Sequence, residues 1–175
     1  MAAPTLNAEG QSKEVYWNSS QSLAVGPTTN SQAVAVTTSG AAYIAADVVG
    51  GIISLLTVNS STGRRVSLRS ATIEEKGGAA PALKIYFFKA TPAAGTYTDN
   101  AALVWGTGDA ANQVGVLNVL AADYVTDVVQ TSVTYSGLDM KITPAATTLF
   151  MLIVSQGAYT LTNGNLTIQL EFDQE

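Results

Sequence analysis

Apolar and polar side chains alternate with a period of two along much of this chain, a pattern that is typical of β-strands. The clearest alternation runs from Leu166 to Phe172, where every second residue is Leu, Ile or Phe and the residues between are Thr, Gln and Glu. Leu83 to Phe88 predicts a second strand, with one fully apolar face and one mixed, aromatic face. From Leu149 to Val154 the odd- and even-numbered residues are all apolar. This pattern predicts a central strand buried on both faces or one whose outer face meets another subunit.

Two of the predicted strands contain irregularities. In Arg64 to Glu75 the apolar positions change parity between Leu68 and Ala71. A change of face by one residue predicts a β-bulge. The Gly50-Gly51 pair interrupts the apolar run that starts at Tyr43, and it indicates either a turn or a bulge between two short strands.

Turn-forming residues separate these runs. Ser136-Gly137 predicts a turn, Asn163-Gly164 a hairpin turn, and Thr91 to Asn100 a long loop. The segment 101–105 fits a short helical turn or a strand, 114–120 fits a strand, and 121–129 fits either a short helix or a strand. Apolar runs of about five to eight residues between such turns predict an all-β protein, an antiparallel β-sandwich of jelly-roll type.

The first 30 residues differ from the rest of the chain. They are polar and irregular apart from a short apolar island, Val15, Tyr16 and Trp17, so we divide the chain into an extended N-terminal arm (1–30) and a single sandwich domain (31–175). The arm is either a loose terminus with one strand-like segment or a segment that orders on a neighbouring subunit. In the second case Tyr16 and Trp17 are the anchors, because such aromatic residues dominate interface energies.

The amino-acid composition limits the kinds of chemical site that this chain can form. A chain of 175 residues is expected to form one domain with a sizeable core, and it contains neither cysteine nor histidine. Disulfides, thiolate metal sites and histidine general bases are therefore excluded. Charged residues make up only 12% of the chain, so we expect a surface of hydroxyls and amides, suited to contact with partner chains.

The charge distribution argues against nucleic acid as a partner. The net charge is −5, and the only basic cluster is Arg64, Arg65 and Arg69. This cluster fits a solvated strand edge, where charges discourage pairing with other strands, or an inter-subunit salt bridge. The N-terminus lacks the pattern of a secretory signal, and the most apolar window is too interrupted to span a bilayer, so we expect a soluble protein without a membrane partner.

The motifs that carry chemistry in other proteins are weak here. The segment GTGDAA at 106–111 lacks the third glycine and the strand–helix context of a dinucleotide loop. Asp123 and Asp127 share one face if 121–129 is helical, but isolated loop aspartates are usually turn formers. We therefore predict no enzyme, no catalytic or metal-binding residues and no cofactor.

Two stretches resemble a known family. Residues 43–50, YIAADVVG, match a Y-x-A-x-D-V-V-G pattern, and LKIYFFKATP at 83–92 followed by TDNAA at 98–102 resembles the same family's strand and loop. The family consists of capsid decoration (cement) proteins of tailed bacteriophages. The resemblance covers about residues 31–175, and this chain departs from it in having Ala and Gly where family members often carry basic residues around the first strand.

The resemblance implies a structural protein of the virion, made in the host cytoplasm and seated on the outer capsid surface. It implies a homotrimer that bridges subunits of the major capsid protein. The residues expected at capsid or subunit contacts are Val15, Tyr16, Trp17, Arg64, Arg65 and Arg69.

Two other functions remain open at this level. The first is a receptor- or carbohydrate-binding module of a phage fibre or spike, in which Tyr97, Trp105 and Tyr159 would line one groove and stack on sugars. The second is a cupin-like enzyme, which the absence of histidine disfavours because histidine is the usual cupin metal ligand.

Overall fold

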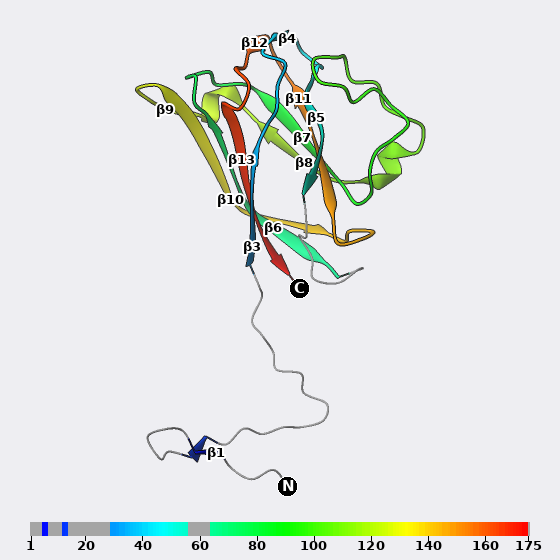
Figure 1. The fold of residues 1–175 in the computed structure, drawn as a ribbon, viewed down its shortest axis with the longest axis vertical. Helices are drawn as coiled ribbons and strands as arrows, with labels where there is room; N and C mark the ends of the chain where they lie inside the picture. The colour runs from blue at the N-terminus through cyan, green and yellow to red at the C-terminus, as the bar shows by residue number, and fades with distance from the viewer. Residues whose placement is uncertain (1–4, 7–11, 14–28, 56–63, 175) are drawn as a thin grey trace.

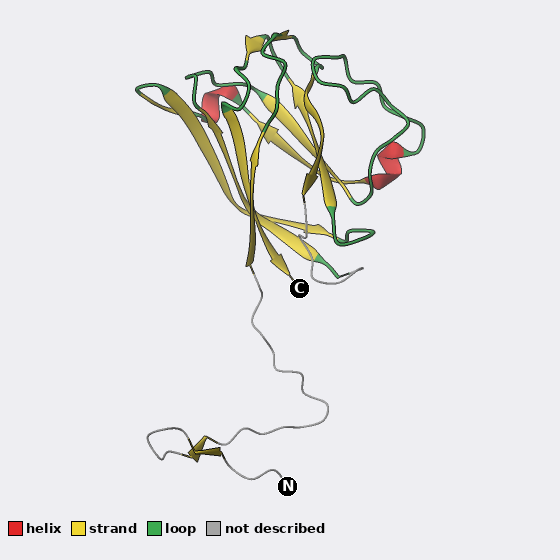
Figure 2. Cartoon of the chain, in the orientation of Figure 1, coloured by secondary structure: helices red, strands yellow, loops and turns green. Residues whose placement is uncertain are grey.

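The computed structural model describes residues 5–6, 12–13, 29–55 and 64–174, and these last two ranges form one β-sandwich (Figure 1). Two antiparallel sheets pack face to face, and nearly all regular structure in the described residues is strand (Figure 2). The first sheet has the order β3 (Thr29–Ala35), β13 (Leu166–Gln174), β6 (Val66–Glu75), β10 (Gln130–Ile142), β9 (Val125–Asp127). The second sheet has the order β5 (Val48–Leu55), β11 (Leu149–Ser155), β7 (Leu83–Phe88), β8 (Gln113–Val119).

Short elements complete the described structure. β1 pairs with β2, β4 pairs with β12, and two 3₁₀ turns, η1 and η2, flank β8. Their bounds are β1 (Thr5–Leu6), β2 (Ser12–Lys13), β4 (Ala42–Tyr43), β12 (Tyr159–Thr160), η1 (Asp109–Asn112) and η2 (Ala121–Asp123). None of the described helical segments is long and apolar enough to cross a membrane.

The strand order is that of a jelly roll. Leaving aside the short β9, the strands of the sandwich in chain order are β3, β5, β6, β7, β8, β10, β11 and β13. The first sheet then holds the first, eighth, third and sixth of them side by side, and the second sheet holds the second, seventh, fourth and fifth. This arrangement of two interleaved four-stranded sheets confirms the fold class expected from the sequence.

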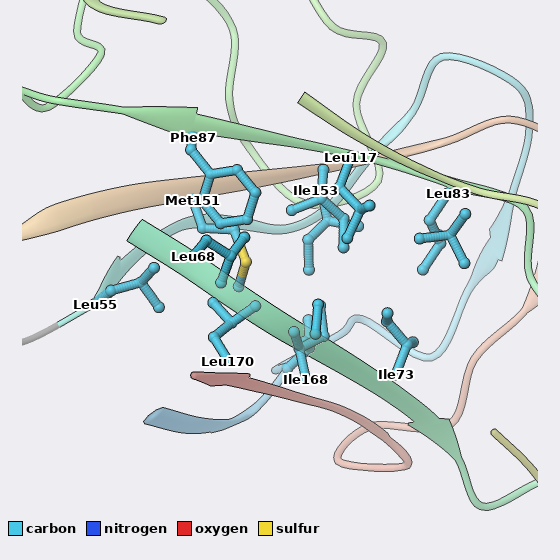
Figure 3. Close-up of a cluster of buried hydrophobic side chains, with 14 of the residues drawn as sticks. Leu55, Leu68, Ile73, Leu83, Phe87, Leu117, Met151, Ile153, Ile168 and Leu170 are labelled. Atoms are coloured by element: carbon cyan, nitrogen blue, oxygen red, sulfur yellow. The ribbon is translucent and has the colours of Figure 1, made fainter. Parts of the chain in front are cut away.

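The core lies between the two sheets. β13 alternates as predicted, with Leu166, Ile168, Leu170 and Phe172 fully buried. Side chains from both sheets meet there in Figure 3, which labels Leu55, Leu68, Ile73, Leu83, Phe87, Leu117, Met151, Ile153, Ile168 and Leu170. Burial of each such side chain stabilises the fold by about 1.5–3 kcal/mol.

Both predicted irregularities are bulges. In β6 the pairing with β13 passes from Ser70 directly to Leu68, so Arg69 is the extra residue of the bulge. Because of this extra residue, Leu68 and Ala71 are both buried in the core although they are three residues apart. In β5 the partners of β11 pass from Ile52 to Val49, which leaves Gly50 and Gly51 in the bulge with φ values of +77° and +75°. β5 therefore continues through the glycine pair as one strand.

One turn prediction is wrong, and a second is only partly confirmed. β10 runs through Ser136-Gly137, because β6 pairs with it on both sides and the irregularity is taken up as a bulge between Ser136 and Met140. Asn163-Gly164 does form a turn, closed by Asn165 N–H donating to the Thr162 carbonyl at 3.0 Å. It does not close a hairpin, however, because β12 before it pairs with β4 instead of β13.

Candidate functional site: a loop that covers the second sheet

One face of the second sheet is covered by the chain itself. Between β7 and β8 runs a long loop, residues 89–112, here called the covering loop, which Figure 2 shows along the side of the sheet with η1 near its end. A second apolar cluster fills the space beneath it, with Val48, Phe88, Tyr97, Leu152 and Val154 buried. The outer face of the central strand β11 is therefore buried by an intrachain loop, which settles the alternative left open for Leu149–Val154.

Asp99 fastens the middle of the covering loop. Its carboxylate accepts hydrogen bonds from Ser39 N–H at 2.7 Å, from the Tyr43 hydroxyl at 2.7 Å and from Gly50 N–H at 2.6 Å. Burial opposes ionisation of Asp99, but these hydrogen bonds outweigh it and lower the pKa of Asp99. Burial, together with the hydrogen bond to the carboxylate, raises the pKa of Tyr43 to about 12.

The backbone continues the same attachment. Val48 N–H donates to the Ala101 carbonyl at 2.9 Å, and Asn100 N–H donates to the Val48 carbonyl at 2.8 Å. An isolated antiparallel bridge joins Asp47 to Ala102. The stretches 43–50 and 98–102, which carry the family resemblance, are thus parts of one hydrogen-bonded unit.

Asp109 fastens the far end of the loop. It accepts hydrogen bonds from the Tyr97 hydroxyl at 2.6 Å and from the N–H groups of Ala93 and Ala94 at 3.2 and 3.1 Å. The hydrogen bond from Tyr97 is the main cause that lowers the pKa of Asp109, and burial raises the pKa of Tyr97. Both carboxylates act as acceptors of existing hydrogen bonds, so their role is to hold the loop in place.

Trp105 lies on the outside of this assembly. Its ring meets Tyr86 edge-on with a centroid separation of 5.0 Å and Phe88 at 6.0 Å. The Lys84 ammonium lies 5.5 Å from the centroid of the Tyr86 ring. The indole therefore packs against two aromatic rings of β7, and 39% of the area of Trp105 stays exposed.

The groove expected for a sugar-binding module is not assembled. Tyr97 is buried under the covering loop, and Tyr159 packs against Tyr43 with a centroid separation of 5.9 Å. Of the three aromatic residues only Trp105 offers an exposed face, so the described structure lacks the shared stacking surface that this function needs.

The predicted contact residues fall in two places. Val15, Tyr16 and Trp17 lie outside the described residues. Arg64 and Arg65 are exposed just before β6, and Arg69 forms an ion pair of 2.6 Å with Asp173 of β13. β6 lies between β13 and β10, so the expectation of a strand edge is wrong for Arg69, which projects from a bulge inside the sheet.

The remaining acidic residues do not gather. Asp123 belongs to η2 and Asp127 to β9, so no α-helix places them on one face. Asp123 accepts the Tyr135 hydroxyl at 2.6 Å, and Asp139 accepts the Ser67 hydroxyl at 3.0 Å. The described residues contain no group of three or more acidic side chains placed to hold a metal ion.

The β9–β10 hairpin is a surface feature that the sequence did not predict. Val125, Val128 and Val129 are all exposed there, and Val128 has 93% of its area open to solvent. The sequence marks this hairpin only by a Val-Val pair between Asp127 and Gln130, at the two positions of the turn where turn-forming residues are usual.

Comparisons with known proteins give only distant matches. No family model and no curated protein matches the sequence. A chain from the structure of tomato aspermy virus matches with a TM-score of 0.41 at 8% identity, over 89% of this chain and 80% of that one. A chain from infectious bursal disease virus strain Gx matches with a TM-score of 0.40 at 11% identity, over 99% of this chain and 36% of that one. The VP2 subviral particle of the same virus gives a TM-score of 0.36 at 9% identity, over 85% and 41%. This chain spans less than half of the two infectious bursal disease virus chains, and the likeness is a distant one of fold.

Proposed function

We propose that this chain is a structural virion protein that decorates a bacteriophage capsid and cements it by bridging major capsid subunits. One observation carries the proposal. The two stretches that resemble the decoration family lie 56 residues apart, measured from Tyr43 to Asp99, yet their residues bond directly to each other. If the two stretches matched the family by chance, there would be no reason for their residues to contact each other. Such contact is expected if both stretches belong to one structural unit of a shared fold.

Cementing a shell depends on surface and not on chemistry. A protein that bridges capsid subunits adds contacts that must be broken before the shell can open or expand, and it stabilises the assembled state by mass action. Symmetric repetition of weak contacts multiplies their effect. A surface with few charges, as in this chain, lets such contacts form without the desolvation of many ions.

The major capsid protein is the main partner, a homotrimer is the expected assembly, and the outer capsid surface is the location after synthesis in the host cytoplasm. The proposed contact residues are the arm residues Val15, Tyr16 and Trp17 and the basic residues Arg64, Arg65 and Arg69.

The test uses phage particles that lack this protein. Purified chain is mixed with them, and the bound copies are counted and located by electron microscopy while the temperature of shell disruption is followed. Saturable binding in many copies over the shell, with a higher disruption temperature, supports decoration. Absence of binding contradicts the proposal, and a few copies at a tail or spike would favour the receptor-binding alternative.

A further inference from the structure

Most of the large apolar side chains that the described residues expose lie close together in the sequence. Four of these seven side chains lie on or just before the β9–β10 hairpin and are here called the hairpin patch: Leu120, Val125, Val128 and Val129. Single exposed apolar residues are normal on a folded domain, but a group of them marks a surface that a partner covers. The hairpin patch is therefore a candidate docking surface.

The tip of this hairpin has a strained backbone. Asp127 pairs with Gln130, so Val128 and Val129 are the two central residues of the turn, and Val128 has a φ of +30°. A two-residue turn with positive φ at its first central residue prefers glycine there, and positive φ is unfavourable for a β-branched residue. Val128 is also 93% exposed, so packing within the described chain does not offset this strain. Strain that the fold does not explain points to a function of the side chain.

The base of the hairpin is held in a fixed position. The Tyr135 hydroxyl of β10 donates to Asp123 at 2.6 Å and accepts from Leu120 N–H at 3.4 Å, which ties the segment before β9 to β10. The ladder from Val125 to Asp127 then joins β9 to β10. The patch is thus preformed, and a partner that binds a preformed surface does not have to order it.

The hairpin lies at the opposite end of the sandwich from the point where the arm joins it. The arm meets the sandwich at Thr29, where β3 begins, and Figure 1 shows this point at the lower end, near the end of β13. The tip of the β9–β10 hairpin projects at the upper end. A protein that bridges capsid subunits needs at least two separate contacts, and the hairpin patch offers one that is remote from the start of β3.

The charges near the tip define the kind of surface that fits it. Asp123 and Asp127 lie in the same segment as the patch, residues 120–129, which contains neither Lys nor Arg. Carboxylates beside apolar side chains favour a partner with basic residues around an apolar pocket. They disfavour nucleic acid and anionic lipid surfaces, which would repel them.

We propose that the hairpin docks Val128 and Val129 into an apolar pocket with a basic rim on a subunit of the major capsid protein. This inference rests on the proposed function, and it adds a contact to the arm residues and arginines proposed there. Burial of the two valines in the pocket supplies free energy that offsets the strained turn.

The experiment compares the binding of purified variants, over a range of concentrations, to phage particles that lack this protein. The hairpin variant is V128G/V129N, which puts glycine at the strained position and removes both valine side chains. The matched control is Val104→Thr, which also removes apolar surface from an exposed valine but lies in the covering loop. Thermal melts and sedimentation velocity of each variant are measured without particles.

The unmodified chain and the control are expected to bind equally. The hairpin variant is expected to bind at least about tenfold more weakly, because residues at the centre of a contact carry most of its energy. Its melting temperature should be the same or higher, since glycine relieves the strain at the turn, and its self-association should be unchanged. Weaker binding by a chain that is no less stable separates a docking role from a structural one.

A second variant tests the basic rim. Asp127→Asn removes a charge beside the tip and is expected to weaken particle binding by about threefold at low salt, with a smaller difference at high salt. Equal binding of this variant and the unmodified chain at low salt would overturn the basic rim.

Particles that bind the hairpin variant as tightly as the unmodified chain would overturn this inference and leave the proposed function standing. An unmodified chain that binds no particles would overturn both. A hairpin variant that melts at a lower temperature or loses self-association would assign the valines to the fold or to a contact between copies, and would overturn the inference as well. The same holds if the unmodified chain sediments with vesicles of phosphatidylcholine and phosphatidylglycerol and the hairpin variant does not, since the valines would then bind lipid.

Discussion

Tyrosine hydroxyls in this protein occupy two kinds of surroundings. Three of them donate to aspartates, in the pairs Tyr43–Asp99, Tyr97–Asp109 and Tyr135–Asp123. Two others, on Tyr124 and Tyr159, are buried and find no hydrogen-bond partner among the described residues. A hydroxyl bonded to a carboxylate stabilises the fold, whereas a buried hydroxyl without a partner costs free energy.

The replacement Tyr43→Phe should lower the free energy of unfolding by about 1–2 kcal/mol, because Asp99 loses one of its three donors and the ring stays in place. The matched control is Tyr124→Phe, which removes a hydroxyl that lacks a partner in the described structure and should be neutral or stabilising. Urea unfolding of both variants measures the difference. Equal losses in the two would mean that the Asp99 hydrogen bond contributes nothing.

At the scale of elements, the alternation of apolar residues predicted most of the strands, because burial of one sheet face imposes it. It also predicted the bulge at Arg69, since the change of parity between Leu68 and Ala71 has no other simple cause. Local turn chemistry was a poorer guide. Ser136-Gly137 is spanned by β10 because its partner β6 is already fixed in the sheet, so tertiary pairing overrides the turn preference.

The candidate site was less predictable than the strands. Hydrogen bonds within the covering loop, such as that from Tyr97 to Asp109, join residues that are close in the sequence. The hydrogen bonds of Asp99 with Ser39 and Gly50 instead join residues that are far apart in the sequence. Only the fold brings these segments together. Turn-forming chemistry at Asp99 was visible in the sequence, and its three donors were not.

The covering loop should lose its attachment in acid. The folded pKa values of Asp99 and Asp109 lie below the ordinary value of 3.8, so the stability that they contribute is fully present above that pH and is lost as the pH falls through the folded values. Hydrogen-exchange protection of the Gly50 and Ala94 amides should therefore drop below about pH 4. In Asp99→Asn, where this side chain cannot titrate, the protection of Gly50 should become independent of pH over the same range, and an unchanged pH profile would contradict the assignment.

The bulge in β5 requires glycine for two reasons. Gly50 has φ of +77°, and an added Cβ would lie 2.4 Å from Val36 Cγ1 and 3.1 Å from the Thr37 carbonyl oxygen. Gly50→Ala should destabilise the fold by more than about 2 kcal/mol, from backbone strain and steric overlap together. Gly40→Ala, with a similar φ of +73° and open space around it, should cost only about 1 kcal/mol in the same denaturation experiment.

At the scale of the whole molecule, the two sheets present different outer faces. The first sheet carries a polar face, where Thr72 and Thr134 share a hydrogen bond of 3.0 Å and Ser70 donates to Glu171 at 2.7 Å. The second sheet carries an apolar face that the covering loop closes. The covering loop therefore shields the apolar face of the second sheet from solvent, and β3, which begins at Thr29, lies at one edge of the first sheet.

This arrangement separates the fold from the proposed capsid contact of the arm. Among the residues that the structure describes, the buried ones lie at Val36 and beyond, so deletion of residues 2–26 should leave the melting temperature within about 2 °C of the full chain. If the arm grips a neighbouring subunit through Tyr16 and Trp17, the same deletion should weaken binding to particles that lack the protein by at least about tenfold. The double replacement Tyr16→Ala and Trp17→Ala should reproduce most of that loss, because aromatic anchors carry a large share of interface energy. Particle binding that is unchanged in the deletion would assign the contact to the sandwich alone, and a large fall in melting temperature would mean that the arm contributes to the fold.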